Sequence, residues 1–201
     1  MKTSIMLAFL ALPLGTLAAQ QPSAPPAPNP AAAANPITTL LRNRTLAYQR
    51  NLAQAFDSIP ERIYGYAPTP AQQTIGYVAQ HLANDNYLFC NRFGAMQGTR
   101  AAADTTTADT VKAKWPRDQL IAKMKESFKF CEDAYAQLDD TKLLEATTIS
   151  FGGQSRPTTR LAMALGHITD MAEHYSQIAN YMRINNILPP TALPRPRPPS
   201  E

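Results

Sequence analysis

Helical periodicity is the feature that most limits what this chain can fold into. Four stretches, residues 38–58, 72–93, 116–138 and 158–186, repeat apolar side chains at intervals of three and four, so each has one apolar face. Strand signal is weak, and only "TTISFGG", residues 147–153, predicts a short extended piece followed by a turn. The expected fold class is therefore all-α, a four-helix bundle with long loops between the helices.

Both ends of the chain lack this periodicity. Residues 1–19 hold one lysine, a short apolar run and then small residues, which is the layout of a secretory signal peptide. Residues 20–36 and 189–201 are rich in proline, which blocks helix and sheet, and they predict a disordered linker and a disordered tail. We therefore expect the bundle over residues 37–188, in a protein exported to the periplasm or the cell exterior.

The charge of the chain argues against two classes of partner. The formal net charge is only +4, and the basic residues are scattered along the sequence. Such a distribution offers no basic patch for nucleic acid or for an anionic membrane surface. The apolar run at the N-terminus is also too short to span a bilayer comfortably. We expect a small-molecule substrate or ligand, no nucleic acid, no stable membrane insertion, and leave a homodimer open.

The three histidines of the chain all lie on predicted apolar faces. His167 and His174 share the apolar stripe of the last helix, and His81 lies on the apolar face of the second. A buried imidazole without a hydrogen-bond partner or a metal costs on the order of 1–3 kcal/mol. One such histidine is more often a satisfied core residue than a ligand. Several inward histidines and carboxylates on two helices instead favour a bound ion or a water cluster.

Spacing narrows the choice of metal ligands. Asp170 and His174 are four residues apart, with Cβ atoms about 5–6 Å apart, and can hold one ion together. His167 is seven residues from His174, roughly 10.5 Å along the axis, which is too far. The predicted ligands are His81, Asp170 and His174. His167 then supports the ligands, contacts substrate or is a satisfied core residue; Asp85 either orients His81 or faces the open mouth of the bundle.

The two cysteines are poor candidates for metal ligands. Cys131 lies on the apolar face of the third helix, and Cys90 points about 180° away from His81 on the second. Export would place both where a disulfide persists, and a disulfide of this span adds about 2–4 kcal/mol of stability. The alternative is a pair of separate buried thiols.

Two segments resemble the DinB superfamily of metalloenzymes: "TIGYVAQHLANDNYLFC" around His81, and "HYSQIANYMRINNILPP", which begins at His174. The resemblance spans residues 37–190 and implies a four-helix bundle of DinB-like type, with these two histidines at metal-ligand positions. Asp170 stands where the family usually has another histidine, and Ser176 stands where it usually has glycine. A carboxylate is nevertheless a competent ligand for zinc, iron, manganese or nickel.

The resemblance also implies a divalent metal with open coordination positions, facing a pocket at the mouth of the bundle. Family members include thiol-dependent transferases, isomerases and hydrolases, so we expect a metal-dependent transferase or hydrolase. The polar groups expected beside the pocket are Tyr77, Asn84, Asp85, Tyr175 and Arg183. Two alternatives stay open: a non-catalytic metal- or ligand-binding bundle of the cell envelope, and a purely structural or partner-binding domain.

Overall fold

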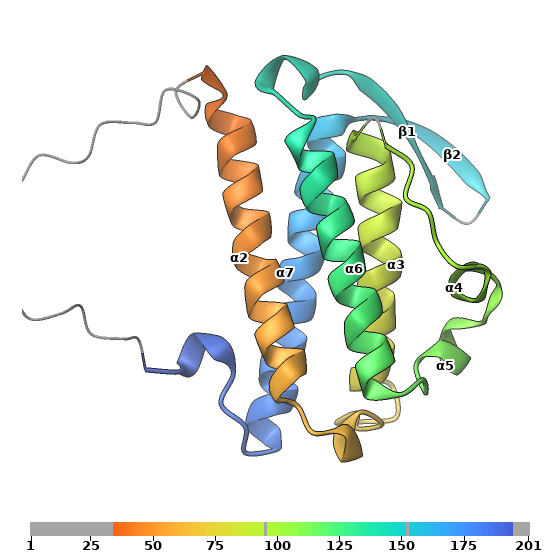
Figure 1. The fold of residues 1–201 in the computed structure, drawn as a ribbon, viewed down its shortest axis with the longest axis vertical. Helices are drawn as coiled ribbons and strands as arrows, with labels where there is room; N and C mark the ends of the chain where they lie inside the picture. The colour runs from red at the N-terminus through yellow and green to blue at the C-terminus, as the bar shows by residue number, and fades with distance from the viewer. Residues whose placement is uncertain (1–33, 95, 152, 195–201) are drawn as a thin grey trace, which may run out of the picture.

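Four long helices form the body of the protein, as the sequence predicts (Figure 1). They are α2 (Pro36–Ser58), α3 (Ile75–Phe93), α6 (Arg117–Ala136) and α7 (Arg160–Ile184). The computed structural model describes residues 34–94, 96–151 and 153–194. The expected signal peptide and most of the expected linker therefore lie outside the described residues, as does the chain from residue 195 onward.

Threonine side chains cap the N-terminal ends of α3 and α7. The hydroxyl of Thr74 accepts a hydrogen bond from the backbone N–H of Tyr77 at the start of α3. Thr159 does the same for the backbone N–H of Ala162 at the start of α7. Such caps satisfy N–H groups that have no partner within the helix and stabilise it by about 1 kcal/mol. They set the register in which each helix presents its polar side chains.

The helices do not simply alternate in direction (Figure 1). α2 and α7 run one way, whereas α3 and α6 run the other way. α3 packs between α6 and α7, and α2 packs between the same two helices on the opposite side. Because α3 and α6 are parallel neighbours, the chain must return along the length of the bundle between them. Residues 94–116 make this return and form two short helices, α4 (Ala102–Thr106) and α5 (Asp109–Lys112).

A β-hairpin joins α6 to α7 at the end of the bundle where α2 begins (Figure 1). Strand β1 (Ala146–Phe151) pairs antiparallel with β2 (Gln154–Thr159), with Ala146 opposite Thr159. Gly153 has a φ of 79°, in the region that favours glycine, as tight turns require. The first strand and the turn are at the predicted place. The second strand carries mostly exposed polar residues, so the sequence shows no apolar alternation there.

The folded domain continues past residue 188, where the expected boundary lies. Pro190–Ala192 form a 3-10 helix, η3, that packs against α2. The Tyr175 hydroxyl donates to the Thr191 hydroxyl at 2.8 Å and accepts from the Thr191 backbone N–H at 3.1 Å. Proline prevents this segment from continuing α7, but it does not prevent one turn of 3-10 helix.

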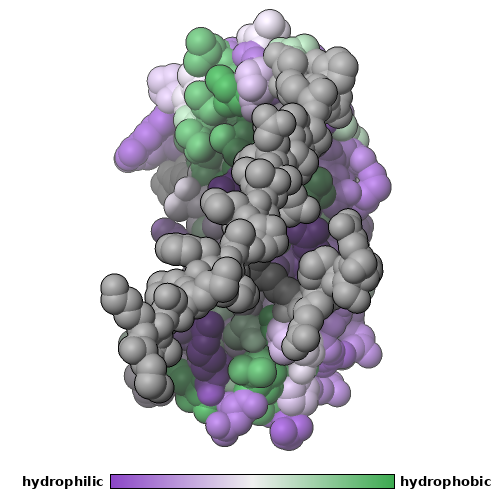
Figure 2. Space-filling model, turned by 90° about the vertical axis from the view of Figure 1, so that its left-hand side faces the viewer, coloured by the Kyte–Doolittle hydropathy of each residue, from purple (hydrophilic) through white to green (hydrophobic). Residues whose placement is uncertain are grey.

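Large apolar side chains remain exposed at both ends of the molecule. On the side of α2, Figure 2 shows hydrophobic surface near the upper and lower ends. Leu40 of α2 is 58% exposed, and Leu188 after α7 is 61% exposed. Single exposed residues of this kind are common on protein surfaces. Among the described residues, no helix combines the length and apolar character needed to cross a membrane.

Candidate metal centre

Two helices that run in opposite directions bring four polar side chains together. α3 carries His81 and, one turn later, Asp85; α7 carries Asp170 and, one turn later, His174. Because the helices are antiparallel, the histidines face each other and so do the carboxylates. The His81 and His174 rings meet edge to face, with centroids 4.9 Å apart. Within each helix, the histidine Nε2 contacts its aspartate: 3.1 Å for His81–Asp85 and 3.3 Å for His174–Asp170.

The three predicted ligands are brought within reach of one ion. One ligand atom from each of His81, Asp170 and His174 lies within 4.8 Å of the other two. Ligands bound to a metal at about 2.0–2.2 Å lie roughly 3–4.4 Å from one another, so small side-chain rotations suffice. Their side chains are 27%, 15% and 12% exposed, respectively, and so are partly open to solvent.

One atom of this group lacks the partner that its burial requires. Asp170 Oδ2 is buried and accepts no hydrogen bond from any described residue. A buried carboxylate oxygen without a hydrogen bond or a cation is costly. Two imidazole nitrogens and a carboxylate suit zinc, iron, manganese and nickel. The residues present therefore fit a divalent metal.

Burial and neighbouring charges shift the pKa values of the site. Burial, and then the nearby His174, lower the pKa of His81. Burial also lowers the pKa of His174, but the hydrogen bond and the charge of Asp170 outweigh it, and this pKa lies above its ordinary value. Burial and then the Asp170 charge raise the pKa of Asp85 to about 7. The raised pKa favours the protonated form of Asp85, and a hydrogen bond that its side chain shares with Asp170 acts in the same direction.

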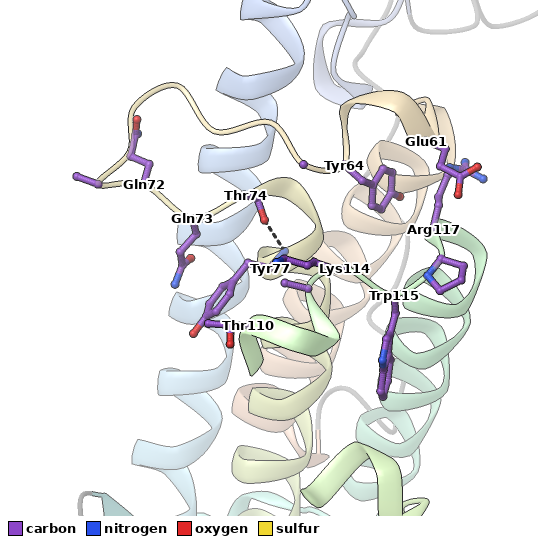
Figure 3. A pocket seen from close by; sticks show the side chains of 14 residues that line it. Glu61, Tyr64, Gln72, Gln73, Thr74, Tyr77, Thr110, Lys114, Trp115 and Arg117 are labelled. Carbon is purple, nitrogen blue, oxygen red and sulfur yellow. Dashed lines mark hydrogen bonds between the residues drawn. The ribbon is translucent and has the colours of Figure 1, made fainter. Parts of the chain in front are cut away.

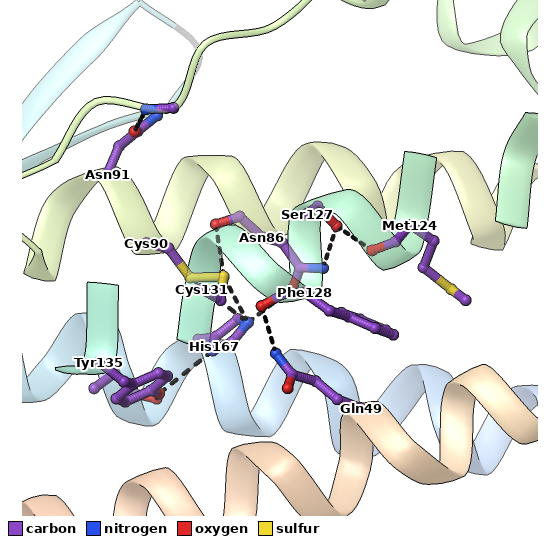
Figure 4. The surroundings of a disulfide bond; sticks show 12 residues. Gln49, Asn86, Cys90, Asn91, Met124, Ser127, Phe128, Cys131, Tyr135 and His167 are labelled. Atoms are coloured by element: carbon purple, nitrogen blue, oxygen red, sulfur yellow. Dashed lines mark hydrogen bonds between the residues drawn. A yellow bond between two sulfur atoms is a disulfide. The ribbon is translucent and has the colours of Figure 1, made fainter. Parts of the chain in front are cut away.

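His167 lies in the core, close to Asn86 and Tyr135 (Figure 4), and does not belong to the group formed by His81, Asp170 and His174. It is fully buried, with Nε2 2.8 Å from Asn86 Oδ1 and Nδ1 3.3 Å from the Tyr135 hydroxyl. A neutral ring that donates to Asn86 and accepts from Tyr135 satisfies both nitrogens. Burial lowers the pKa of His167 to about 4, which keeps the ring neutral. Of the three roles the sequence leaves open, the structure places His167 as a satisfied core residue.

A disulfide between Cys90 and Cys131 joins α3 to α6 beside His167. His167 Nε2 lies 3.9 Å from the Cys90 Sγ and 3.6 Å from the Cys131 Sγ, so these three residues also form a compact group of metal-binding atom types. Disulfide sulfurs, however, are not thiolates, and thiolate is the form in which cysteine binds metals. The oxidised protein therefore has one candidate metal centre among the described residues.

The residues expected beside the site separate into two groups. Tyr77 stacks on the His81 ring at 6.0 Å, one turn before it on α3. Asn84 instead bonds to Asp109, Tyr175 bonds to Thr191, and an Arg183 nitrogen donates to the Ala179 carbonyl. Tyr77 and Asp85 are thus the members of the expected set that contact the candidate ligands.

Sequence reasoning missed one residue that touches a ligand. Gln177 Oε1 lies 3.2 Å from His174 Nδ1, and Gln177 Nε2 donates to the Tyr181 hydroxyl. If His174 Nδ1 carries the proton, its Nε2 is left free to bind a metal. The i,i+3 spacing from His174 is the sequence signal that identifies this glutamine.

Two cavities lie beside residues that contact the candidate ligands, whereas the expected pocket at the bundle mouth would face the metal itself. The larger, about 790 Å³, lies between the start of α3 and the start of α6 and includes Tyr77, Lys114 and Trp115 (Figure 3). The other, about 730 Å³, includes Gln177. Neither is lined by His81, Asp170 or His174. Each reaches a residue that contacts a candidate ligand: Tyr77 contacts His81, and Gln177 contacts His174.

Comparison with known proteins agrees with this fold. The sequence model described as the DinB superfamily matches residues 45–178. A crystal structure of a DinB-like protein from Bacillus cereus ATCC 10987 has a TM-score of 0.57 at 14% identity, covering 74% of this chain and 93% of that one. A conserved protein from Enterococcus faecalis has a TM-score of 0.54 at 14% identity, covering 74% of this chain and 96% of that one. No curated protein matches the chain.

Proposed function

The chain belongs to the DinB superfamily, and from that premise we propose that it is a metal-dependent enzyme of the transferase or hydrolase class. The proposed ligands of its divalent metal are His81, Asp170 and His174. The observation that carries this proposal is the clustering of their ligand atoms within 4.8 Å of one another. The buried Asp170 oxygen without a hydrogen bond supports it independently.

Each neighbouring side chain has a task in this proposal. Gln177 Oε1 accepts a hydrogen bond from His174 Nδ1–H and so orients the ring with Nε2 toward Asp170. The Tyr77 ring covers one side of His81 and shields it from water. A divalent metal, when bound, lowers the pKa of a coordinated water or thiol and so supplies a nucleophile at neutral pH. The Tyr77 cavity, lined by aromatic, amide and cationic groups, offers the space for a small-molecule substrate.

Metal analysis of the purified protein tests the ligand set. We expect stoichiometric metal in the wild type after loading with zinc, nickel, iron or manganese, and its loss in both His174→Ala and Asp170→Ala. Glu173→Ala serves as the control, because this neighbouring carboxylate is exposed on α7 and should leave metal content unchanged. A wild type that takes up no metal under any of these conditions rules out the proposal in this form.

One observation favours a second candidate function, a non-catalytic bundle that binds metal or ligand. The candidate ligands line neither of the two cavities, so a molecule in a cavity meets Tyr77 or Gln177 before it meets the metal. Thiol-transfer and hydrolysis assays on the metal-loaded protein, with His174→Ala as the blank, separate the two candidates. Stoichiometric metal without turnover of any thiol or ester substrate favours the binding function.

Export is part of the same proposal. A buried disulfide in the core fits a compartment that is oxidising, such as the periplasm. Mass spectrometry of the mature protein from a periplasmic extract should find its N-terminus close to residue 20. Recovery of the uncleaved chain from the cytoplasm alone would contradict this.

A further inference from the structure

The contact between His81 and Asp85 has the same geometry as the contact between His174 and Asp170. The Nε2–Oδ distances are 3.1 Å and 3.3 Å, and both pairs have i,i+4 spacing. Two ligands bound to one ion at about 2.0–2.2 Å and at angles between 90° and 109° lie roughly 3.0–3.5 Å apart. Both contacts therefore already have the separation of adjacent ligands on one metal.

The order of the residues on the two helices makes the site nearly symmetric. α3 presents histidine before aspartate, and α7, which runs the opposite way, presents aspartate before histidine. A two-fold rotation between the helices thus exchanges His81 with His174 and Asp85 with Asp170. A metal between the two helices therefore lies beside both pairs.

Asp85 loses its contact with His81 Nε2 once that nitrogen binds a metal. In the metal-free site Asp85 Oδ2 lies 3.1 Å from His81 Nε2, and the Asp85 side chain also shares a hydrogen bond with Asp170. A metal bound at that nitrogen replaces its proton. The Asp85 and Asp170 carboxylates repel each other when both are ionised, and a cation between them removes that repulsion.

We propose that Asp85 is a fourth metal ligand, so that the ion is held by two histidines and two aspartates. The inference rests on the proposed function and extends its ligand set. Asp85 lies outside the group of three whose atoms are all within 4.8 Å, so its carboxyl must rotate toward the ion. The two carboxylates balance the charge of a divalent ion and leave two positions in an octahedral complex. Their oxygen atoms favour manganese or iron over softer metals.

The alternative places Asp85 outside the coordination shell. In that arrangement His81 binds the metal through Nδ1, and Asp85 keeps its hydrogen bond to Nε2. Both arrangements predict weaker metal binding when Asp85 is replaced. Affinity alone cannot separate them, so the test needs a signal that arises only from direct coordination.

Cobalt(II) in place of the native metal gives that signal. In Asp85→Cys, a thiolate bound to cobalt produces an intense near-ultraviolet charge-transfer band, which a thiolate outside the coordination shell does not. Asp109→Cys is the matched control. The Asp109 charge raises the pKa of both His81 and Asp85, but Asp109 does not contact His81. We expect the band in the first variant and its absence in the second.

Asp85→Asn provides a second measurement that does not depend on the cysteine variant folding. We expect this change to weaken cobalt binding at least tenfold and to alter the visible cobalt spectrum, with the circular dichroism of the protein unchanged. Suppose that the wild type binds cobalt, Asp85→Cys gives no charge-transfer band, and Asp85→Asn leaves the visible spectrum unaltered. Asp85 is then not a ligand, and the proposed function is unaffected. Wild type that binds no cobalt overturns the proposed function itself.

Discussion

The three histidines differ in how they respond to pH because they lie in different surroundings. His167 is enclosed, with burial holding its pKa at about 4, whereas an unfolded chain protonates histidine near 6.5. The unfolded state therefore binds the extra proton between these values. The stability that His167 contributes is fully present above pH 6.5 and is lost as the pH falls toward 4.

Replacing His167 should make the free energy of unfolding depend less on pH. We expect His167→Gln to lower the free energy of unfolding at pH 7.5 because the core loses a fitted side chain. The further loss on going from pH 7.5 to pH 4 should then be smaller than in the wild type, by on the order of 3 kcal/mol. Urea unfolding of both proteins across this range measures the difference. Parallel pH profiles would show that folding does not lower the pKa of His167.

Gln177 should control metal affinity although it is not a ligand. Removing its hydrogen bond to His174 Nδ1 frees the ring to rotate and to change tautomer. We expect Gln177→Ala to weaken zinc binding by about 10–100-fold, measured by competition with a chelator, and Gln177→Glu to retain most of the affinity. Ser176→Ala, at an exposed neighbouring position, is the control. Equal affinities for the alanine variants would remove this role for Gln177.

Much of the candidate site could be predicted because it depends on spacing along single helices. Asp170 and His174 are one turn apart, which suffices to place them together. Tyr175 follows His174 by a rotation of about 100°, so the same arithmetic could have excluded it. The neutral network around His167 could not be predicted, because it depends on how α3 meets α6 and α7.

At the scale of helices, the disulfide and the candidate metal centre lie at different levels of α3. Cys90 is nine residues beyond His81, roughly 13.5 Å along the axis. The disulfide ties α3 to α6, whereas the metal ligands lie on α3 and α7. Stability and metal binding should therefore be separable.

Removing the disulfide tests this separation. We expect Cys90→Ala with Cys131→Ala to lower the free energy of unfolding by about 2–4 kcal/mol, because the unfolded chain regains freedom. Metal affinity well below the unfolding temperature should stay unchanged. Urea unfolding and metal titration of the double variant provide the two readings. A large fall in affinity would show that the disulfide positions α3 against α7.

The helices were easier to predict than the connections between them. Apolar periodicity is a local signal, so all four long helices begin and end close to the predicted residues. The connection between α3 and α6 is fixed by polar contacts instead. Buried Lys112 donates to the Asp104 carbonyl and the Asn84 side chain, and it pairs with Asp109. The burial of a lysine cannot be predicted from the residues around it in the sequence.

At the scale of the whole molecule, the segment after α7 closes the fold. Tyr175 and Thr191 exchange two hydrogen bonds that hold η3 beside α2. We expect Tyr175→Phe to lower the free energy of unfolding by about 1 kcal/mol. A chain ending at Leu188 should also be less stable, and Tyr175→Phe should cost it nothing further. Thermal unfolding of the two single changes and their combination measures this coupling; additive losses would mean that Tyr175 acts independently of η3.

The two cross-links of the molecule are nested in the chain. The Cys90–Cys131 bridge spans 41 residues and lies inside the longer span from His81 to Asp170 and His174. For a flexible polymer, an inner link shortens the outer loop and lowers the entropy lost on closing it. The entropic cost of closing a loop grows only with the logarithm of its length, so the inner link lowers the cost of the outer loop by about 0.5 kcal/mol. Oxidation and metal loading are therefore nearly independent in thermodynamic terms, and a cell can carry them out in either order.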